Sequence, residues 1–196
     1  LALELERAAQ HHRLDPEAIF RAVAGVHRRC RGAYAIVAMI AGYGMLAFRD
    51  PFGIRPLVIG VAETPGGPEH MVASESVALE ACGFRVLRDV DPGEAIYVDF
   101  AGTMHARQCA ESSRLVPCIF EYVYLARPDS VIDGTSVYES RIHMGAALAR
   151  RIRAMPEAGD IDVVIPIPDS SRPSAMQLAN DLALTCDVAG ERMQDG

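Results

Sequence analysis

The fold class of the chain's second half is decided by residues 161–173, which read IDVVIPIPDSSRP. Residues 161–165 form a short apolar run of the kind that is buried in a parallel sheet. Pro173 suits the first turn of a helix, which we expect to continue to Ala183. A strand, a loop and a helix in this order predict an α/β unit. Ligands of such sheets bind beyond the carboxyl ends of the strands, so this loop is the first candidate site.

Polar side chains crowd the loop at Asp169, Ser170, Ser171 and Arg172. Backbone N–H groups at a helix N-terminus favour an anion, and hydroxyl and carboxylate oxygens suit a hydrated Mg²⁺. The loop therefore predicts a phosphate site, or a Mg²⁺ site beside a phosphate. A plain helix cap is the alternative interpretation, because Asp and Ser begin helices in many proteins.

Residues 136–155, which precede this unit, predict a long amphipathic helix. Its apolar side chains are expected to face inward and its arginines outward. The expected inward residues are Val137, Ile142, Met144, Leu148 and Ile152, and the expected outward residues are Arg141, Arg150, Arg151 and Arg153. Before this helix, we expect Arg127 and Asp129 to form an ion pair that holds a turn.

The first half of the chain has a different pattern. Its first residues resemble the middle of a helix, and Asp15 followed by Pro16 predicts the start of another, which runs to about Cys30. Short apolar runs separated by turn residues then predict an antiparallel sheet with helices, an α+β layered domain that ends near residue 117. The expected strands are 33–40, 45–48, 57–61, 71–74, 84–89 and 94–100, with a short helix at 76–82.

A charged loop, residues 49–56, connects two of the expected strands. It carries Arg49, Asp50 and Arg55. These residues suit either the lining of a substrate pocket or an ordinary loop ion pair, and the second interpretation is the simpler one.

The composition narrows the chemistry that this chain can perform. It has 196 residues and a formal net charge of −7, and all 19 of its basic residues are arginine. Without lysine, a phosphate-binding P-loop and Schiff-base catalysis are excluded within this chain. The acidic balance argues against nucleic acid as a partner. No run of about 20 apolar residues predicts a membrane span, so we expect no membrane partner.

The cysteines favour a reducing compartment. Their number is odd, they are widely spaced, and no CxxC occurs; they are Cys30, Cys82, Cys109, Cys118 and Cys186. This usage argues against a disulfide framework and for the cytoplasm. His27 and Cys30 have a spacing that suits a shared metal, but two ligands without a second pair favour a buried thiol beside a surface histidine.

Several blocks of the sequence resemble a known family. Residues 31–35 (RGAYA), 48–57 (FRDPFGIRPL), 73–79 (ASESVAL) and 92–95 (PGEA) resemble the later half of a class II glutamine amidotransferase domain. Residues 118–130 (CIFEYVYLARPDS) and 164–171 (VIPIPDSS) narrow the resemblance to the amidophosphoribosyltransferases. It covers about residues 1–185, and the chain stops following the family after Cys186.

The resemblance implies two domains. Residues 1–117 would be the later part of an N-terminal-nucleophile αββα domain, and residues 118–196 a linker and the start of a type I phosphoribosyltransferase domain. In the family, an N-terminal cysteine hydrolyses glutamine, and the ammonia displaces pyrophosphate from Mg²⁺-bound phosphoribosyl pyrophosphate. The product is 5-phosphoribosylamine, the first intermediate of purine synthesis. The implied protein is a cytoplasmic homo-oligomer, and the family forms tetramers.

The same resemblance carries over a few site residues. Ser170 would contact Mg²⁺, Asp169 and Ser171 would bind substrate, and Tyr124 and Arg127 would lie near the ammonia path. The nucleophilic cysteine precedes Leu1 in the family, so we expect an internal segment with no catalytic residue and no glutaminase activity of its own. Cys118 matches a ligand of the iron–sulfur members, but we expect a free thiol and no cluster.

Two alternative functions remain open. One is a segment of another class II amidotransferase joined to a different synthase, against which residues 118–130 and 164–171 argue. The other is a non-catalytic binding module derived from the enzyme.

Overall fold

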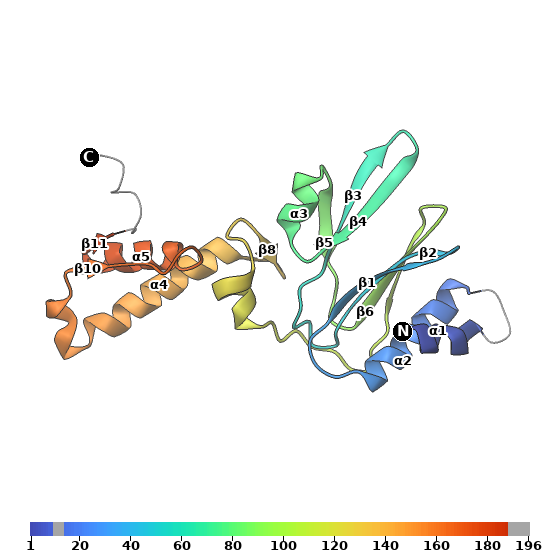
Figure 1. Ribbon diagram of the computed structural model, residues 1–196, viewed down its shortest axis with the longest axis horizontal. Coiled ribbons are helices and arrows are strands. Elements are labelled where there is room, and N and C mark those ends of the chain that lie inside the picture. The colour runs from blue at the N-terminus through green and yellow to red at the C-terminus, as the bar shows by residue number, and fades with distance from the viewer. Residues whose placement is uncertain (10–13, 188–196) are drawn as a thin grey trace. The chain divides into compact units, whose positions relative to one another are not determined.

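The computed structural model of the chain describes residues 1–9 and 14–187. Most of the segment in which the chain stops following the family, residues 188–196, therefore lies outside the described residues. The chain divides into two compact units, Leu1–Cys118 and Ile119–Gly196 (Figure 1).

Two antiparallel sheets and three helices make up the described part of the first unit. The helices are α1 (Ala2–Ala9), α2 (Pro16–Arg29) and α3 (Ser76–Ala81). One sheet has the order β1-β2-β6-β7, with β1 (Ala35–Ile40), β2 (Gly44–Arg49), β6 (Glu94–Asp99) and β7 (Met104–Gln108). The other has the order β4-β3-β5, with β3 (Val58–Thr64), β4 (Gly67–Ala73) and β5 (Arg85–Asp89).

The residue pattern alone indicated one antiparallel sheet, and the structure corrects this to two. Strands β5 and β6 are neighbours in the sequence but pair with β3 and β2 respectively. Apolar alternation shows which residues form strands but not which strands become partners, because pairing depends on contacts between distant residues.

Hydrophobic contacts stack the first unit in the order helix, sheet, sheet, helix. Helix α2 packs on the first sheet through a cluster whose buried members include Ile19, Phe20, Val23, Val26, Leu46, Phe48, Ala95 and Tyr97. The opposite face of that sheet meets the second sheet through Ala47, Leu57, Ile59, Val90 and Ile96. Gly60, next to Ile59 on strand β3, faces the other way and receives Leu79 of helix α3.

Helix α2 begins at the predicted capping signal. Asp15 is the N-cap residue, its carboxylate accepts a hydrogen bond of 2.7 Å from the backbone N–H of Ala18, and Pro16 follows. This bond satisfies one of the N–H groups that a helix start leaves without a partner. We therefore expect Asp15→Ala to lower the free energy of unfolding of the first unit by about 1 kcal/mol, and Asp15→Ser to keep most of it. Urea unfolding followed by circular dichroism measures both changes. Equal midpoints for Asp15→Ala and the unaltered chain would contradict this prediction.

The five cysteines are free thiols, and they differ in environment. Cys109 is buried, and this burial raises the pKa of its thiol to about 11, whereas Cys30 and Cys82 are exposed. Because the thiolate is the reactive form, we expect iodoacetamide at pH 8 to modify Cys109 about 100-fold more slowly than Cys82. Peptide mass spectrometry over a time course gives both rates. Comparable rates in the folded chain would contradict the expected burial, and urea should abolish the difference.

The second unit is an arrangement of helices and short strands. Its elements are η1 (Glu121–Leu125, a π-helical turn), β8 (Val131–Ile132), β9 (Thr135–Ser136), α4 (Val137–Arg153), η2 (Pro156–Asp160, a 3₁₀ turn), β10 (Val163–Val164), α5 (Arg172–Leu182) and β11 (Thr185–Cys186). Strands β10 and β11 pair in parallel on either side of helix α5 in the sequence, as in an α/β unit.

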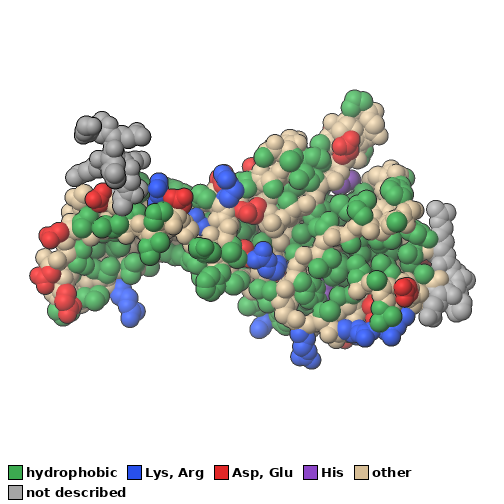
Figure 2. All heavy atoms as spheres, viewed as in Figure 1, with side chains coloured by type: hydrophobic (Ala, Val, Ile, Leu, Met, Phe, Trp, Pro, Cys, Tyr) green, Lys and Arg blue, Asp and Glu red, His purple; other side chains and the backbone are tan. Residues whose placement is uncertain are grey.

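The strand predicted at residues 161–165 is shorter and more exposed than expected. Only Val163 and Val164 form a strand, and Ile165 is 60% exposed. Within the described residues, β11 is the only strand that pairs with it, so no wider sheet buries its side chains. Figure 2 shows hydrophobic side chains exposed on the visible face of this unit. The expectation of a buried strand is therefore wrong.

Helix α4 buries a face that matches the predicted one only in part: Val137 is buried and Arg150, Arg151 and Arg153 are exposed, as expected. Its buried residues are four positions apart: Val137, Arg141, Gly145 and Ala149. Arg141, expected to face outward, is 2% exposed, whereas Leu148, expected to face inward, is 46% exposed. Helix α5 packs so closely on this face that a side chain at Gly145 would place its Cβ 2.3 Å from the carbonyl oxygen of Ser174. Small residues are therefore required at the contact, and Leu148 lies elsewhere.

Candidate functional site

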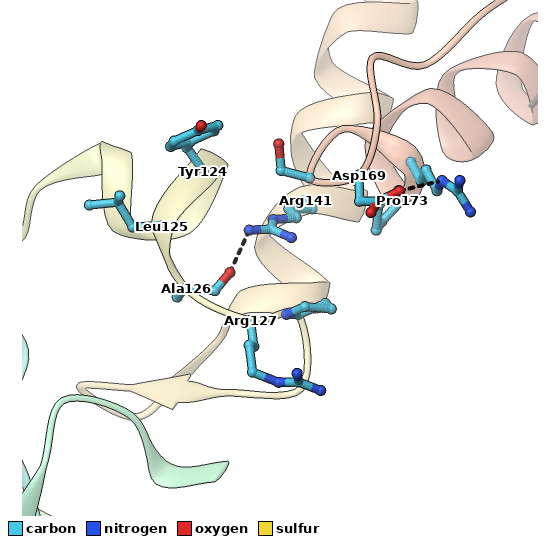
Figure 3. A pocket seen from close by; sticks show the side chains of 10 residues that line it. Tyr124, Leu125, Ala126, Arg127, Arg141, Asp169 and Pro173 are labelled. Carbon is cyan, nitrogen blue, oxygen red and sulfur yellow. Dashed lines mark hydrogen bonds and ion pairs between the residues drawn. The ribbon is translucent and has the colours of Figure 1, made fainter. Parts of the chain in front are cut away.

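A cavity of about 600 Å³ lies in the second unit, between residues 124–128 and the start of helix α5 (Figure 3). Its lining residues are Tyr124, Leu125, Ala126, Arg127, Pro128, Arg141, Asp169, Ser170, Arg172 and Pro173. The structure thus brings Asp169 and Ser170 together with Tyr124 and Arg127, from the two blocks that the sequence singled out. Ser171 is not among the lining residues.

One wall of the cavity is the loop that leads into helix α5. The peptide bond between Pro168 and Asp169 is cis. Asp169 forms an ion pair with Arg172, with 3.1 Å between Oδ1 and Nε (Figure 3). Ser171 is the N-cap residue of helix α5, but its hydroxyl donates a hydrogen bond to the carbonyl of Ile167. The hydroxyl of Ser171 is therefore used within the loop, while Ser170 borders the cavity.

The other wall is the segment after the π-helical turn η1. The backbone N–H of Ala126 donates to the carbonyl of Glu121 at 2.9 Å and closes the turn. Arg127 holds the carboxylate of Asp129 with two hydrogen bonds of 3.0 Å, which confirms the expected ion pair. The Arg127 guanidinium keeps the pKa of Asp129 below its usual range. Most of the Tyr124 side chain is exposed.

Arg141 is the residue of the cavity that sequence reasoning missed. Its Nε donates to the carbonyl of Tyr122 at 2.7 Å. One terminal nitrogen donates to the carbonyl of Ala126 at 2.8 Å (Figure 3). Burial lowers the pKa of this guanidinium. The available signal was the stripe that Arg141 shares with Gly145 and Ala149, because small residues at this spacing mark a close helix contact.

The lining favours an anionic ligand. Three guanidinium groups and one carboxylate border the cavity, and arginine suits the planar recognition of phosphate oxygens. Within the described residues, no three or more His, Cys, Asp or Glu side chains are placed to hold a metal. The oxygens of Asp169 and Ser170 nevertheless fit Mg²⁺, since this ion is usually held by one or two carboxylates together with the phosphates of a substrate.

A second cavity, of about 510 Å³, lies in the first unit beside the C-terminal end of helix α2. It is bordered by His27, Cys30 and Cys109 among others. The Nδ1 of His27 lies 2.8 Å from the hydroxyl of Tyr34, and burial lowers the pKa of the imidazole. The expected buried thiol beside a surface histidine is therefore wrong: Cys30 is exposed, and the His27 ring is the partly buried member of the pair, because it packs beside Tyr34.

In the part of the chain that the structure describes, no helix has both the length and the apolar character needed to cross a membrane. No family model matches the sequence.

Three curated proteins with similar sequences share the name amidophosphoribosyltransferase. The chain is 56% identical to amidophosphoribosyltransferase of Pasteurella multocida over 174 residues, which are 88% of this chain and 34% of the relative. It is 54% identical to the Escherichia coli protein of the same name over 174 residues, with the same shares. Its identity to the Saccharomyces cerevisiae protein is 46% over 185 residues, which are 92% of this chain and 36% of the relative.

Solved structures agree with these relatives. The glutamine phosphoribosylpyrophosphate amidotransferase of B. subtilis, complexed with ADP and GMP, matches 95% of this chain and 37% of its own at 32% identity, with a TM-score of 0.76. The structure of the allosteric regulatory enzyme of purine biosynthesis matches the same shares at 31% identity, with a TM-score of 0.78.

The mixed α/β fold is therefore that of a region of the amidotransferases. Over the residues that it spans, the chain belongs to the amidophosphoribosyltransferase family. It spans about a third of the length of the curated relatives that it matches.

Proposed function

We propose that this chain is the part of an amidophosphoribosyltransferase that connects glutamine hydrolysis to phosphoribosyl transfer. Residues 1–117 are the later part of the glutaminase domain, of the N-terminal-nucleophile type. Residues 118–196 are the linker and the start of a type I phosphoribosyltransferase domain. The observation that carries the proposal is the cavity in which Asp169 and Ser170 meet Tyr124, Arg127 and Arg141. The division of the chain after Cys118 supports it.

The proposed reaction is that of the whole protein. Glutamine supplies ammonia, and the ammonia displaces pyrophosphate from phosphoribosyl pyrophosphate to give 5-phosphoribosylamine, the first step of purine synthesis. Mg²⁺ would be held by Ser170, where it would neutralise the charge of the leaving diphosphate, and Asp169 beside it would bind substrate. Ser171 would act from the N-cap of helix α5, where backbone N–H groups attract a phosphate. We also propose that the protein is a cytoplasmic homo-oligomer.

The experiment uses the protein encoded by the reading frame that contains residues 1–196. With glutamine, Mg²⁺ and phosphoribosyl pyrophosphate, it should release pyrophosphate and glutamate in equal amounts. Ser170→Ala should weaken the apparent affinity for phosphoribosyl pyrophosphate by about tenfold, and Ser112→Ala, an exposed serine of the first unit, should not. Release of glutamate without pyrophosphate would favour an amidotransferase joined to another synthase. Binding of phosphoribosyl pyrophosphate without turnover would favour a non-catalytic binding module.

The 196-residue chain by itself is expected to behave differently. It should release no glutamate from glutamine, and its Mg²⁺-dependent binding of phosphoribosyl pyrophosphate should be weak or absent in calorimetry. Micromolar binding that Ser170→Ala abolishes would show that the site in this chain is more complete than we propose.

A further inference from the structure

Arg141 is attached to one wall of the cavity by its side chain. Its guanidinium donates to the carbonyls of Tyr122 and Ala126, at 2.7 and 2.8 Å. These two carbonyls lie near the start and just beyond the end of the π-helical turn η1, whose following residues form that wall. Two donors in the fixed fork of one guanidinium therefore set both the distance and the orientation of this segment relative to helix α4.

Arg141 is attached to the other wall by its backbone. The hydroxyl of Ser174, in the first turn of helix α5, donates to the carbonyl of Arg141 at 2.8 Å. One helical turn later, Gly145 lies directly against the carbonyl of Ser174. The loop with Asp169 and Ser170 leads into this same turn of helix α5, so both walls take their positions from Arg141.

The charges of the cavity single out the same residue. Arg127 pairs with Asp129, and Arg172 pairs with Asp169. In the described part of the chain, the hydrogen-bond partners of the Arg141 guanidinium are carbonyl oxygens, which leave its charge uncompensated. A buried charge without a counter-ion is costly, and an anion in the adjacent cavity lowers that cost.

We propose that Arg141 is a positioning residue for a diphosphate-bearing ligand in this cavity. It fixes the spacing between the segment after η1 and the loop that carries Asp169 and Ser170, and its charge favours the ligand there. The identity of the ligand as phosphoribosyl pyrophosphate rests on the proposed function, whereas the attachment of both walls to Arg141 does not.

The first test is amide hydrogen exchange on the 196-residue chain, read by mass spectrometry. Arg141→Met removes both side-chain bonds and the charge, and should speed exchange about tenfold or more in residues 119–130 and 170–177 together. Strands β2 and β6 of the first unit should be unaffected. Arg150→Met, which replaces an exposed arginine of the same helix, is the matched control and should change neither segment. Unchanged exchange in either wall would overturn the proposal.

Two milder variants cover the case in which Arg141→Met fails to fold. Arg141→Lys keeps the charge but offers no planar fork, so it should loosen residues 119–130 to an intermediate extent. Ser174→Ala removes only the bond to the second wall and should speed exchange in residues 170–177. If both variants exchange like the unaltered chain, the proposal is wrong.

The second test measures kinetics in the protein encoded by the containing reading frame. Arg141→Met should raise the KM for phosphoribosyl pyrophosphate about tenfold or more, and Arg141→Lys should recover only part of the loss. Arg150→Met, the matched control, should leave this KM unchanged, which separates positioning from a general effect of removing an arginine from helix α4. If the KM of Arg141→Met for phosphoribosyl pyrophosphate stayed within about twofold of the unaltered protein's, Arg141 would not position this ligand. If the unaltered protein neither binds nor consumes phosphoribosyl pyrophosphate, the proposed function fails, and hydrogen exchange still decides the attachment of the walls.

Discussion

Replacing Asp50 with alanine is expected to lower the free energy of unfolding of the first unit by about 3 to 5 kcal/mol. Asp50 is completely buried at the end of strand β2. Its carboxylate accepts hydrogen bonds from three backbone N–H groups of the loop that follows, those of Phe52, Ile54 and Arg55, at 2.9, 3.2 and 3.1 Å. Alanine leaves these donors buried without an acceptor, and each such group costs about 1 to 3 kcal/mol.

The neighbouring Arg49 increases the effect. It is 1% exposed and donates to the carbonyls of Gly53, Arg55 and Val90 at 2.7 to 2.9 Å. Gly53 and Arg55 belong to the loop that Asp50 holds in place. If Asp50→Ala loosens this loop, the buried Arg49 guanidinium also loses the carbonyls of Gly53 and Arg55 as hydrogen-bond acceptors. Asp50→Asn retains a carbonyl oxygen and should cost less than Asp50→Ala. Arg49 and Asp50 therefore stabilise the conformation of this loop through hydrogen bonds to its backbone.

Urea unfolding of the chain, followed by circular dichroism and by exchange of the β2 amides, measures the loss. The matched control is Asp91→Ala, because Asp91 is an exposed carboxylate of the same unit. We expect that control to stay within about 0.5 kcal/mol of the unaltered chain. A change below about 1 kcal/mol for Asp50→Ala would show that the loop finds other acceptors.

The elements that the sequence predicted well have local causes. Asp15 and Pro16 act within one turn of helix α2, and the carboxylate of Asp15 is bonded three residues away. Arg127 and Asp129 pair across a single turn. Such contacts depend on residues close in the sequence, and a single sequence shows them directly. The pairing of β5 with β3 joins residues 24 to 31 positions apart, so the division into two sheets was not visible in the residue pattern.

The site shows the same limit. The loop with Asp169 and Ser170 could be found because hydroxyls and a carboxylate follow a predicted strand. Arg141 was missed, because an arginine in an amphipathic helix normally marks the solvent face, and the small residues Gly145 and Ala149 on its stripe indicate only a close helix contact. The burial of Arg141 depends on hydrogen bonds to the carbonyls of Tyr122 and Ala126. Every residue has a backbone carbonyl, so the sequence does not show which carbonyls will accept a bond from a distant side chain.

Gly145→Ala is expected to cost the second unit about 3 kcal/mol, although alanine is the best helix former. An added Cβ would lie 2.3 Å from the carbonyl oxygen of Ser174 and 3.0 Å from the side chain of Gln177. The first of these is backbone, which has no rotamer to move into, so helices α4 and α5 must separate. The gain of about 1 kcal/mol in helix propensity is smaller than this cost.

The matched control is Gly159→Ala in the 3₁₀ turn η2, because a Cβ there meets no heavy atom within 4 Å. We expect thermal unfolding and hydrogen exchange to show a large loss for Gly145→Ala, confined to the second unit, and little change for Gly159→Ala. Separating the helices also lengthens the bond between Ser174 and the carbonyl of Arg141, so the loop with Asp169 and Ser170 should exchange faster as well. If Gly145→Ala instead stabilised the unit, the close contact of α4 with α5 would be wrong, and with it the common attachment of the two cavity walls.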